Sequence, residues 1–300
     1  MLPNLIIAGV NKGGTTALFR HLASHPDISP SSVKETCYFL PIRYGCTPGP
    51  LSEYKNYFKN YKNEKLAIES TPGYFYGGTK LANTIKSTLP NVRIVIVLRD
   101  PTSRFFSFFN FMKSMQKLNV NTSASAYLQK CLTITPQEFS DPHNNTYFGL
   151  EGGFYADYLE EWLQVFGKNI HIDFFENLIS DPVSFMNSIS LFAGVDPSPF
   201  NNLKFKKENV TRGHYNQPLH SFALFVYRNF SHIINSNKSL KNFLAYTYNL
   251  VNGAPILKSS DEEEFLRDIV AQHYQPSNKR LKEQLQRFEG TVGSLPNWVD

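Results

Sequence analysis

A glycine-rich turn near the N-terminus constrains the fold more than any other feature of the sequence. The apolar run 5–10 leads into the segment NKGGTT at residues 11–16, and a helical pattern follows. An apolar strand, a glycine turn and a helix are typical of units whose backbone N–H groups bind phosphate-like anions. We therefore expect an anion-binding loop at residues 9–16 and an α/β fold around it.

The loop departs at one position from the phosphate loop of nucleotide hydrolases. That loop reads G-x-x-x-x-G-K-[ST]. Gly9 and Gly14 have its spacing, but Thr15 stands where the lysine would be, and the nearby lysine is Lys12, inside the loop. A glycine turn beside a solvated lysine would have the same sequence, so the interpretation depends on the rest of the chain.

Length and composition limit the class of protein. The chain has 300 residues, of which 41% are hydrophobic, and it shows no repeat and no low-complexity linker. We predict one domain over residues 1–300. No apolar run is long enough to span a membrane, no signal peptide is present, and the three cysteines form no C-x-x-C motif. These features predict a cytoplasmic location if the chain is full length.

The charge balance favours a small anionic ligand over nucleic acid. The net charge is +5 and the isoelectric point is about 8.9, but no dense run of lysine and arginine is present. Nucleic-acid-binding proteins gather such residues into patches that follow the phosphate backbone. We therefore expect no nucleic-acid partner.

Strand and helix patterns alternate along the chain. This rhythm predicts right-handed βαβ units and a central parallel sheet flanked by helices. Ligands of such sheets bind at the carboxyl ends of the strands, so residues 9–16, 70–76 and 99–107 should converge. The expected strands are 5–10, 65–71, 93–98 and 170–175, and the expected helices are 15–24, 51–62, 79–89, 101–117, 152–166, 182–194 and a tail, 260–288, broken in two at Pro276.

Several segments, in this order, resemble the PAPS-dependent sulfotransferase family, most closely its heparan-sulfate-type branch and bacterial relatives. PAPS is 3′-phosphoadenylyl sulfate, and PAP is the product left after sulfuryl transfer. The loop at residues 9–16 is similar to the family's 5′-phosphosulfate loop, and the segment 98–107 (LRDPTSRFFS) to its 3′-phosphate motif. The segment 34–39 (KETCYF) resembles the one that carries the catalytic carboxylate, and segments 174–178 and 273–278 are similar to later family segments.

The resemblance implies a P-loop-like sulfotransferase fold and a role for each site residue. Lys12 stabilises the leaving group and Glu35 is the general base. The 5′ end of PAPS is held by Lys12, Gly13, Gly14, Thr15 and Thr16, the 3′-phosphate by Arg99 and Ser107, and a closing region corresponds to Arg212 and Gly213. Each also has a plainer interpretation: Glu35 as a surface partner of Lys34, Arg99 as a salt-bridge residue, Ser107 as a helix-surface hydroxyl, and Arg212 and Gly213 as a solvated loop.

The chemistry of the donor agrees with this assignment. A donor with a phosphosulfate at one end and a 3′-phosphate at the other needs two anion sites, and sulfuryl transfer requires no metal. Lys12 lies where charge would develop on the leaving oxygen, and a carboxylate can accept the proton of the attacking hydroxyl or amine. We expect a glycan or a small polar metabolite as the acceptor.

One departure from the heparan-type pattern concerns the acceptor. The segment 69–75 (ESTPGYF) carries Ser70 where the family has a lysine that is implied to help catalysis or acceptor sulfate contacts. Its absence disfavours a long anionic glycosaminoglycan. Two other functions remain open at this point: an ATP-dependent small-molecule kinase, against which the missing G-K-[ST] lysine argues, and a non-catalytic PAP-binding protein.

Overall fold

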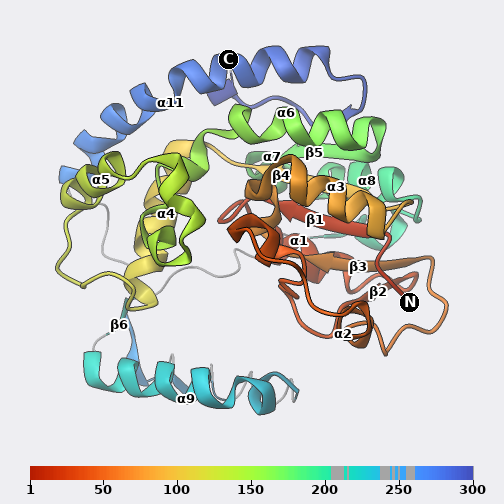
Figure 1. Cartoon of the computed structure of the whole chain (residues 1–300), viewed down its shortest axis with the longest axis horizontal. Helices are drawn as coiled ribbons and strands as arrows, with labels where there is room; N and C mark the ends of the chain where they lie inside the picture. The colour runs from red at the N-terminus through yellow and green to blue at the C-terminus, as the bar shows by residue number, and fades with distance from the viewer. Residues whose placement is uncertain are drawn as a thin grey trace.

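The chain is built around a six-stranded parallel sheet, as the alternating pattern predicts (Figure 1). The computed structural model describes residues 1–203, 213–214, 216–236, 244, 247–248, 251–254 and 261–299. The strand order is β2-β3-β1-β4-β5-β8, so the first strand lies in the middle of the sheet. The strands are β1 (Leu5–Gly9), β2 (Ile28–Pro30), β3 (Leu66–Ser70), β4 (Arg93–Leu98), β5 (Ile170–Phe174) and β8 (Thr291–Val292).

The sheet is buried on both faces, and its central strand β1 has no polar side chain. Ile6 of β1 and Ile94 of β4 enter one core, while Ile7 and Val95, their neighbours in the chain, enter the other. This alternation is the two-residue period of a strand, and a run without polar residues is typical of a parallel strand covered by helices.

Helices cover both faces, and their buried residues show which face each one packs on. Helices α3, α6 and α11 contribute to the core on one side, and α1, α7 and α8 to the core on the other. The helices are α1 (Thr15–Leu22), α2 (Leu51–Asn56), α3 (Gly78–Thr88), α4 (Pro101–Ser114), α5 (Ala124–Thr133), α6 (Tyr155–Phe166), α7 (Phe175–Ser180), α8 (Pro182–Ala193), α9 (Gln217–Ser236) and α11 (Asp261–Arg287).

Two helix predictions are wrong. Helix α2 ends at Asn56, six residues before its expected end, because Tyr54 and Phe58 turn into an aromatic cluster with Tyr38 and Phe39 that closes the turn. Helix α11 runs through Pro276 without a break.

Burial on both sides of Pro276 accounts for the continuous helix. Val270 and Tyr274 are buried before the proline, and Leu281 and Leu285 after it. A proline inside a helix costs about 3 kcal/mol, whereas burying four large apolar side chains contributes about 1.5–3 kcal/mol each. The tail therefore stays helical across α4, α5 and α6 (Figure 1). Ser260, the first residue of the predicted tail, lies outside the described residues.

The carboxyl ends of β1, β3 and β4 meet at one edge of the sheet, as predicted. Register pairs Ile7 of β1 with Ser70 of β3 on one side and with Val95 of β4 on the other. The segments that leave these strands, 10–14, 71–77 and 99–100, therefore start side by side. The loops that carry the predicted site residues Lys12 and Arg99 start at this edge of the sheet.

Candidate active site

The loop after β1 is pinned to the neighbouring strand by its own backbone. The Val10 N–H donates to the carbonyl oxygen of Val97 at 3.0 Å, and the Gly13 N–H donates to Val10 at 3.0 Å. A Cβ atom on Gly13 would lie 2.6 Å from the Val97 oxygen, closer than real contacts allow. Glycine is therefore required at Gly13 by the close approach of two backbones.

The loop ends at the start of α1, where the helix presents free N–H groups. Gly14 precedes the helix in a left-handed conformation, with φ of 84°. Thr15 and Thr16 form the first turn, and that turn contains no acidic residue. The helix dipole and the unpaired N–H groups therefore favour an anion here.

Lys12 lies beside this helix end in a half-buried position. Its ammonium nitrogen is 4.3 Å from the centre of the Phe111 ring. Burial, and next the positive charge of Arg99, lower the pKa of Lys12 from 10.5 to about 8. A lysine with a lowered pKa and an aromatic neighbour is a cation that an incoming anion would stabilise.

Arg99 connects the first loop to the second anion segment. Its Nη1 donates to the carbonyl oxygen of Lys12 at 3.0 Å, and its guanidinium stacks 4.7 Å from the centre of the Phe175 ring. The Tyr155 hydroxyl donates to the Arg99 carbonyl at 2.8 Å. Among the described residues, no carboxylate lies within ion-pair distance of the Arg99 guanidinium, so the plainer salt-bridge interpretation has no partner there.

Helix α4 begins as its sequence predicts. The Asp100 carboxylate accepts the N–H groups of Thr102 and Ser103 at 3.3 and 2.9 Å, and Pro101 occupies the first helical position. Ser107 is half-buried on the second turn of this helix, two turns beyond Arg99. Its hydroxyl makes no hydrogen bond within the described residues.

Glu35 lies on the segment beside the end of β3. Its N–H donates to the carbonyl oxygen of Ser70 at 3.0 Å, and its backbone is left-handed, with φ of 66°. The carboxylate pairs with Lys34 at 2.9 Å, and the Glu35 side chain is 50% exposed. Its charge also raises the pKa of Lys12, opposing the effect of burial. Glu35 therefore forms the ion pair with Lys34, and its negative charge also acts on the ammonium group of Lys12.

Ser70 marks the place of the missing lysine. The residue is fully buried at the end of β3, and its hydroxyl has no hydrogen-bond partner among the described residues. Its backbone carbonyl accepts the Glu35 N–H. The segment next to Glu35 thus carries no positive side chain from β3.

Only part of the predicted closing region belongs to the described residues. Arg212 lies outside the described residues. Gly213 belongs to β6 (Gly213–His214), which pairs antiparallel with β7 (Gly253–Ala254) in a separate two-stranded ribbon. The role of these two residues in cofactor binding stays a prediction.

Comparison with known families identifies the class of protein. The family model described as "Sulfotransferase domain" matches residues 2–212, which include the Lys12 loop, Glu35 and Arg99. The chain belongs to the sulfotransferase family. Its curated relatives carry the names of enzymes, so the chain belongs to an enzyme family.

Curated relatives of this sulfotransferase include enzymes named for heparan sulfate. It is 28% identical over 207 residues to the bifunctional heparan sulfate N-deacetylase/N-sulfotransferase 1 of Caenorhabditis briggsae, covering 66% of this chain and 23% of the relative. It is 27% identical over 218 residues to heparan sulfate glucosamine 3-O-sulfotransferase 5 of Homo sapiens, covering 71% and 59%. The membrane-associated sulfotransferase kil1 of Dictyostelium discoideum is 35% identical over 125 residues, covering 41% and 25%. The matched region thus spans between about a quarter and three fifths of these relatives.

Among solved structures, a sulfotransferase from Alicyclobacillus acidocaldarius has the same fold. The TM-score is 0.59 at 23% identity, and the match covers 80% of this chain and 99% of the other. The predicted sulfotransferase fold, with its parallel sheet and flanking helices, is confirmed. Within the described ranges, no helix combines the length and hydrophobicity needed to cross a bilayer.

Sequence reasoning did not single out two buried charged residues near the sulfotransferase site. Arg104 on α4 is fully buried and donates from Nη1 to the Gly149 carbonyl at 2.7 Å. Glu69 on β3 is also fully buried and accepts hydrogen bonds from three hydroxyl groups. The signal was present in both cases, since each is a charged residue that stands next to large apolar side chains of its own strand or helix.

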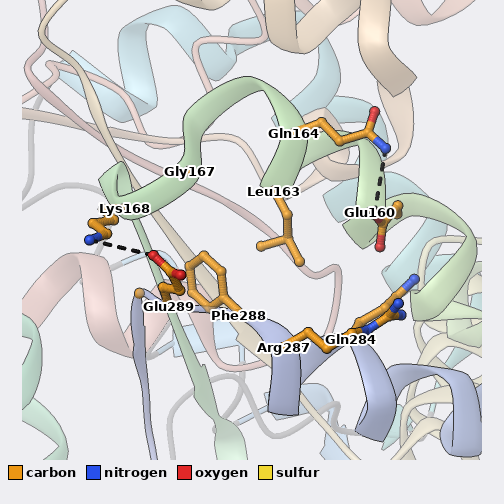
Figure 2. Close-up of a pocket in the computed structure, with 10 residues that line it drawn as sticks. Glu160, Leu163, Gln164, Gly167, Lys168, Gln284, Arg287, Phe288 and Glu289 are labelled. Atoms are coloured by element: carbon orange, nitrogen blue, oxygen red, sulfur yellow. Dashed lines mark hydrogen bonds and ion pairs between the residues drawn. The ribbon is translucent and has the colours of Figure 1, made fainter.

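An open hollow elsewhere on the enzyme does not suit the donor. It has a cavity volume of about 460 Å³ and lies between the C-terminal ends of α6 and α11 (Figure 2). Lys168 in its wall precedes β5, so the hollow lies at the amino ends of the strands, opposite the Lys12 loop. Its lysine pairs with Glu289 at 3.5 Å, and both side chains are exposed. Paired, solvated charges offer little to a multiply charged anion.

Among the described residues, no group of three or more histidine, cysteine, aspartate or glutamate side chains is arranged to hold a metal ion. All three cysteines are free thiols.

Proposed function

We propose that this sulfotransferase uses PAPS as its donor and releases PAP. The proposal is supported by two cationic positions that are connected by a hydrogen bond from the Arg99 side chain to the Lys12 carbonyl. Lys12 and the start of α1 suit the 5′-phosphosulfate, and Arg99, with Ser107 on the following helix, suits the 3′-phosphate. Arginine and helix N-termini are the groups that proteins use most often to bind phosphate.

The reaction is an in-line displacement at sulfur. The acceptor oxygen or nitrogen forms a bond to sulfur while the bond from sulfur to the bridging phosphate oxygen breaks. The electron pair of that bond stays on the bridging oxygen, where the Lys12 ammonium stabilises the developing charge. Glu35 takes the proton of the attacking oxygen or nitrogen, and this increases the nucleophilicity of that atom.

The observation that carries the proposal is the state of Lys12. A half-buried ammonium next to Phe111 and Arg99, with a pKa lowered to about 8, is less stable in the empty site than in water. A negative charge on the leaving group removes this penalty at the moment of transfer. Interactions that strengthen in the transition state are the ones that accelerate a reaction.

We propose a hydroxyl or amine of a carbohydrate or small polar metabolite as the acceptor. The heparan sulfate names of the relatives favour a sugar. Buried Ser70, in place of a lysine, removes a positive charge beside Glu35. A neutral or weakly charged sugar therefore suits this site better than a heavily sulfated chain.

Ligand-dependent unfolding and donor turnover test the proposal together. PAP at a hundred times its dissociation constant should raise the unfolding free energy by about 2.7 kcal/mol, whereas ATP with Mg²⁺ at the same concentration should raise it far less. PAPS should then yield PAP in the presence of a heparosan oligosaccharide or glucosamine. Equal stabilisation by ATP·Mg²⁺ with phosphate transfer would establish a kinase, and PAP binding without any turnover of PAPS would establish a binding protein.

A further inference from the structure

Glu69 is a buried carboxylate surrounded by hydroxyl groups. It ends β3 next to Ser70 and is fully shielded from solvent. Its two oxygens accept hydrogen bonds from Thr36 Oγ1 at 2.9 Å, from Thr71 Oγ1 at 3.0 Å and from the Tyr54 hydroxyl. Among the described residues, no cation pairs with it. Burial raises the pKa of Glu69, and the surrounding hydroxyl groups, including that of Tyr74, oppose that effect.

These hydroxyl groups connect Glu69 to the segment that carries Glu35. Thr36 follows Glu35 directly in the chain. Thr71, which donates to Glu69, also accepts the N–H of Cys37 at 3.2 Å. Glu69 therefore accepts a hydrogen bond directly from the side chain of Thr36, the residue after Glu35. It reaches the backbone N–H of Cys37 through the hydroxyl of Thr71.

The backbone of this segment needs such support. Glu35 and Cys37 have φ values of 66° and 55°, and they flank the buried Thr36. Non-glycine residues adopt this left-handed region rarely, and such conformations persist where the surroundings fix them. The contacts of Thr36 and Cys37 with Glu69 and Thr71 are the side-chain contacts that fix this one.

The Glu35 side chain does not position itself. Its carboxylate is half exposed and pairs with Lys34, its own neighbour in the chain. An ion pair whose carboxylate is half exposed contributes little and holds that side chain only weakly. The direction in which Glu35 points is therefore set by its backbone.

We propose that Glu69 is a positioning residue for sulfuryl transfer: through Thr36 and Thr71 it holds the Glu35 backbone so that the carboxylate stays beside Lys12. This inference rests on the proposed function, in which Glu35 accepts the proton of the acceptor. Glu69 itself touches neither donor nor acceptor.

Substitutions at two of the Glu69 donors separate positioning from folding. Thr36→Val removes the hydroxyl between Glu69 and the Glu35 segment and keeps the side-chain shape. Tyr54→Phe removes a second hydroxyl from the same carboxylate oxygen but leaves the bond from Thr36 to Glu69 in place and keeps the ring. Both leave Glu69 with one donor fewer, so both should lower the thermal midpoint to a similar extent.

Turnover should respond to only one of the two changes. Transfer from PAPS to a heparosan oligosaccharide, or to water if that sugar is not accepted, should fall about 10–100-fold in kcat for Thr36→Val. The dissociation constant for PAP should change less than about twofold, because no Lys12 contact is altered. Thr36→Ser should restore most of kcat, and Tyr54→Phe should stay within about threefold of wild type. Equal loss of kcat in Thr36→Val and Tyr54→Phe, or no rescue by serine, would overturn the proposal.

Amide hydrogen exchange provides an arm that needs no turnover. In Thr36→Val the amides of Glu35 and Cys37, which donate to Ser70 and Thr71, should exchange faster than in Tyr54→Phe and Thr36→Ser. Unchanged exchange would overturn the positioning role even if kcat fell. A wild-type enzyme that binds PAP but never cleaves PAPS would instead end the proposed function, while the exchange result would still show whether Glu69 holds the segment.

Discussion

The loop that carries Lys12 follows β1, and the segment that carries Glu35 lies beside the end of the neighbouring strand β3; the two are built in opposite ways. The first is pinned by backbone hydrogen bonds to β4 and by Arg99, and it leaves its lysine half-buried against Phe111. The second is held by a hydrogen bond between Thr36 and the buried Glu69, and the Glu35 carboxylate is half exposed. A donor that is the same in every turnover permits a preformed site, whereas an acceptor must reach Glu35 from solvent. The difference agrees with the proposed roles, Lys12 on the donor side and Glu35 on the acceptor side.

The strongest test of this contrast is the removal of the Lys12 charge. Lys12→Ala should lower kcat by about 10²–10³-fold, because the developing charge on the leaving oxygen loses its stabilising partner. Steady-state turnover of PAPS measures this effect. Lys168→Ala, which removes an exposed lysine from the hollow in Figure 2, should change kcat less than twofold. Near-normal transfer by Lys12→Ala would refute the catalytic assignment.

Removal of the Glu35 charge should separate the two loops. Glu35→Gln keeps the shape of the side chain and should lower kcat about 10²-fold, the lower end of general-base effects, while the affinity for PAP stays the same. Isothermal calorimetry with PAP measures the second quantity. Glu160→Gln, an exposed glutamate on α6, is the matched control. If Glu35→Gln lost PAP binding in parallel with turnover, the residue would be structural and the contrast between donor and acceptor loops would fail.

Arg99 should determine whether the 3′-phosphate is recognised. The wild type should bind PAP more tightly than AMP, which lacks that phosphate. Arg99→Gln should reduce the ratio of the two affinities by about 10–100-fold, the effect of one charged hydrogen bond. Ser107→Ala should reduce the same ratio less.

Competition binding of PAP and AMP to each variant gives these ratios. Because Arg99 also donates to the Lys12 carbonyl, AMP affinity reports any damage to the first loop. A uniform loss for both ligands would place Arg99 in the scaffold of the Lys12 loop and remove it from the phosphate site.

The smallest expected effect is a proton taken up on binding. The pKa of Lys12 is lowered to about 8 in the empty site, and bound phosphate favours the charged form and raises it. At pH 8 PAP binding should therefore take up about half a proton, at pH 6.5 almost none from Lys12, and affinity should fall as the pH rises above 8. Calorimetry in Tris and phosphate buffers measures the uptake. Lys12→Arg, which stays charged, should abolish it, and uptake that persists in that variant would assign the proton to another group.

The same lowered pKa has a consequence for stability. The unfolded chain binds the lysine proton up to about pH 10.5, whereas the empty folded site releases it near pH 8. Below pH 8 the buried charge destabilises the folded protein, and this cost disappears as the pH rises from about 8 to 10.5.

Local signals accounted for most of the fold. The strand Arg93–Leu98 and the helix start at Asp100 and Pro101 match the prediction because each depends on adjacent residues: an apolar run, a capping carboxylate, a proline at the first helical position. The short strands β2 and β8 had no such signal. Three residues and two residues carry no periodicity, and only the neighbouring strands make them part of the sheet.

The site was predictable where its chemistry lies in one segment and not where it depends on distant contacts. Lys12 and the glycines of its loop can be recognised within one segment of eight residues, 9–16. Glu69 meets Thr36 across 33 residues and Tyr54 across 15, and a carboxylate in a strand pattern does not reveal which hydroxyls it will meet. The roles of Glu35, Arg99, Ser107, Arg212 and Gly213 remain predictions that the experiments above decide.

The ring of Phe111 gives the resting enzyme an advantage that a carboxylate would not. A lysine paired with an aspartate would have to break that ion pair each time a donor bound. The competition from the aspartate would slow donor binding. An uncharged ring 4.3 Å away holds the ammonium weakly and releases it without competing for it. If Lys12 binds the donor as proposed, it is therefore available to each new donor without first breaking an ion pair.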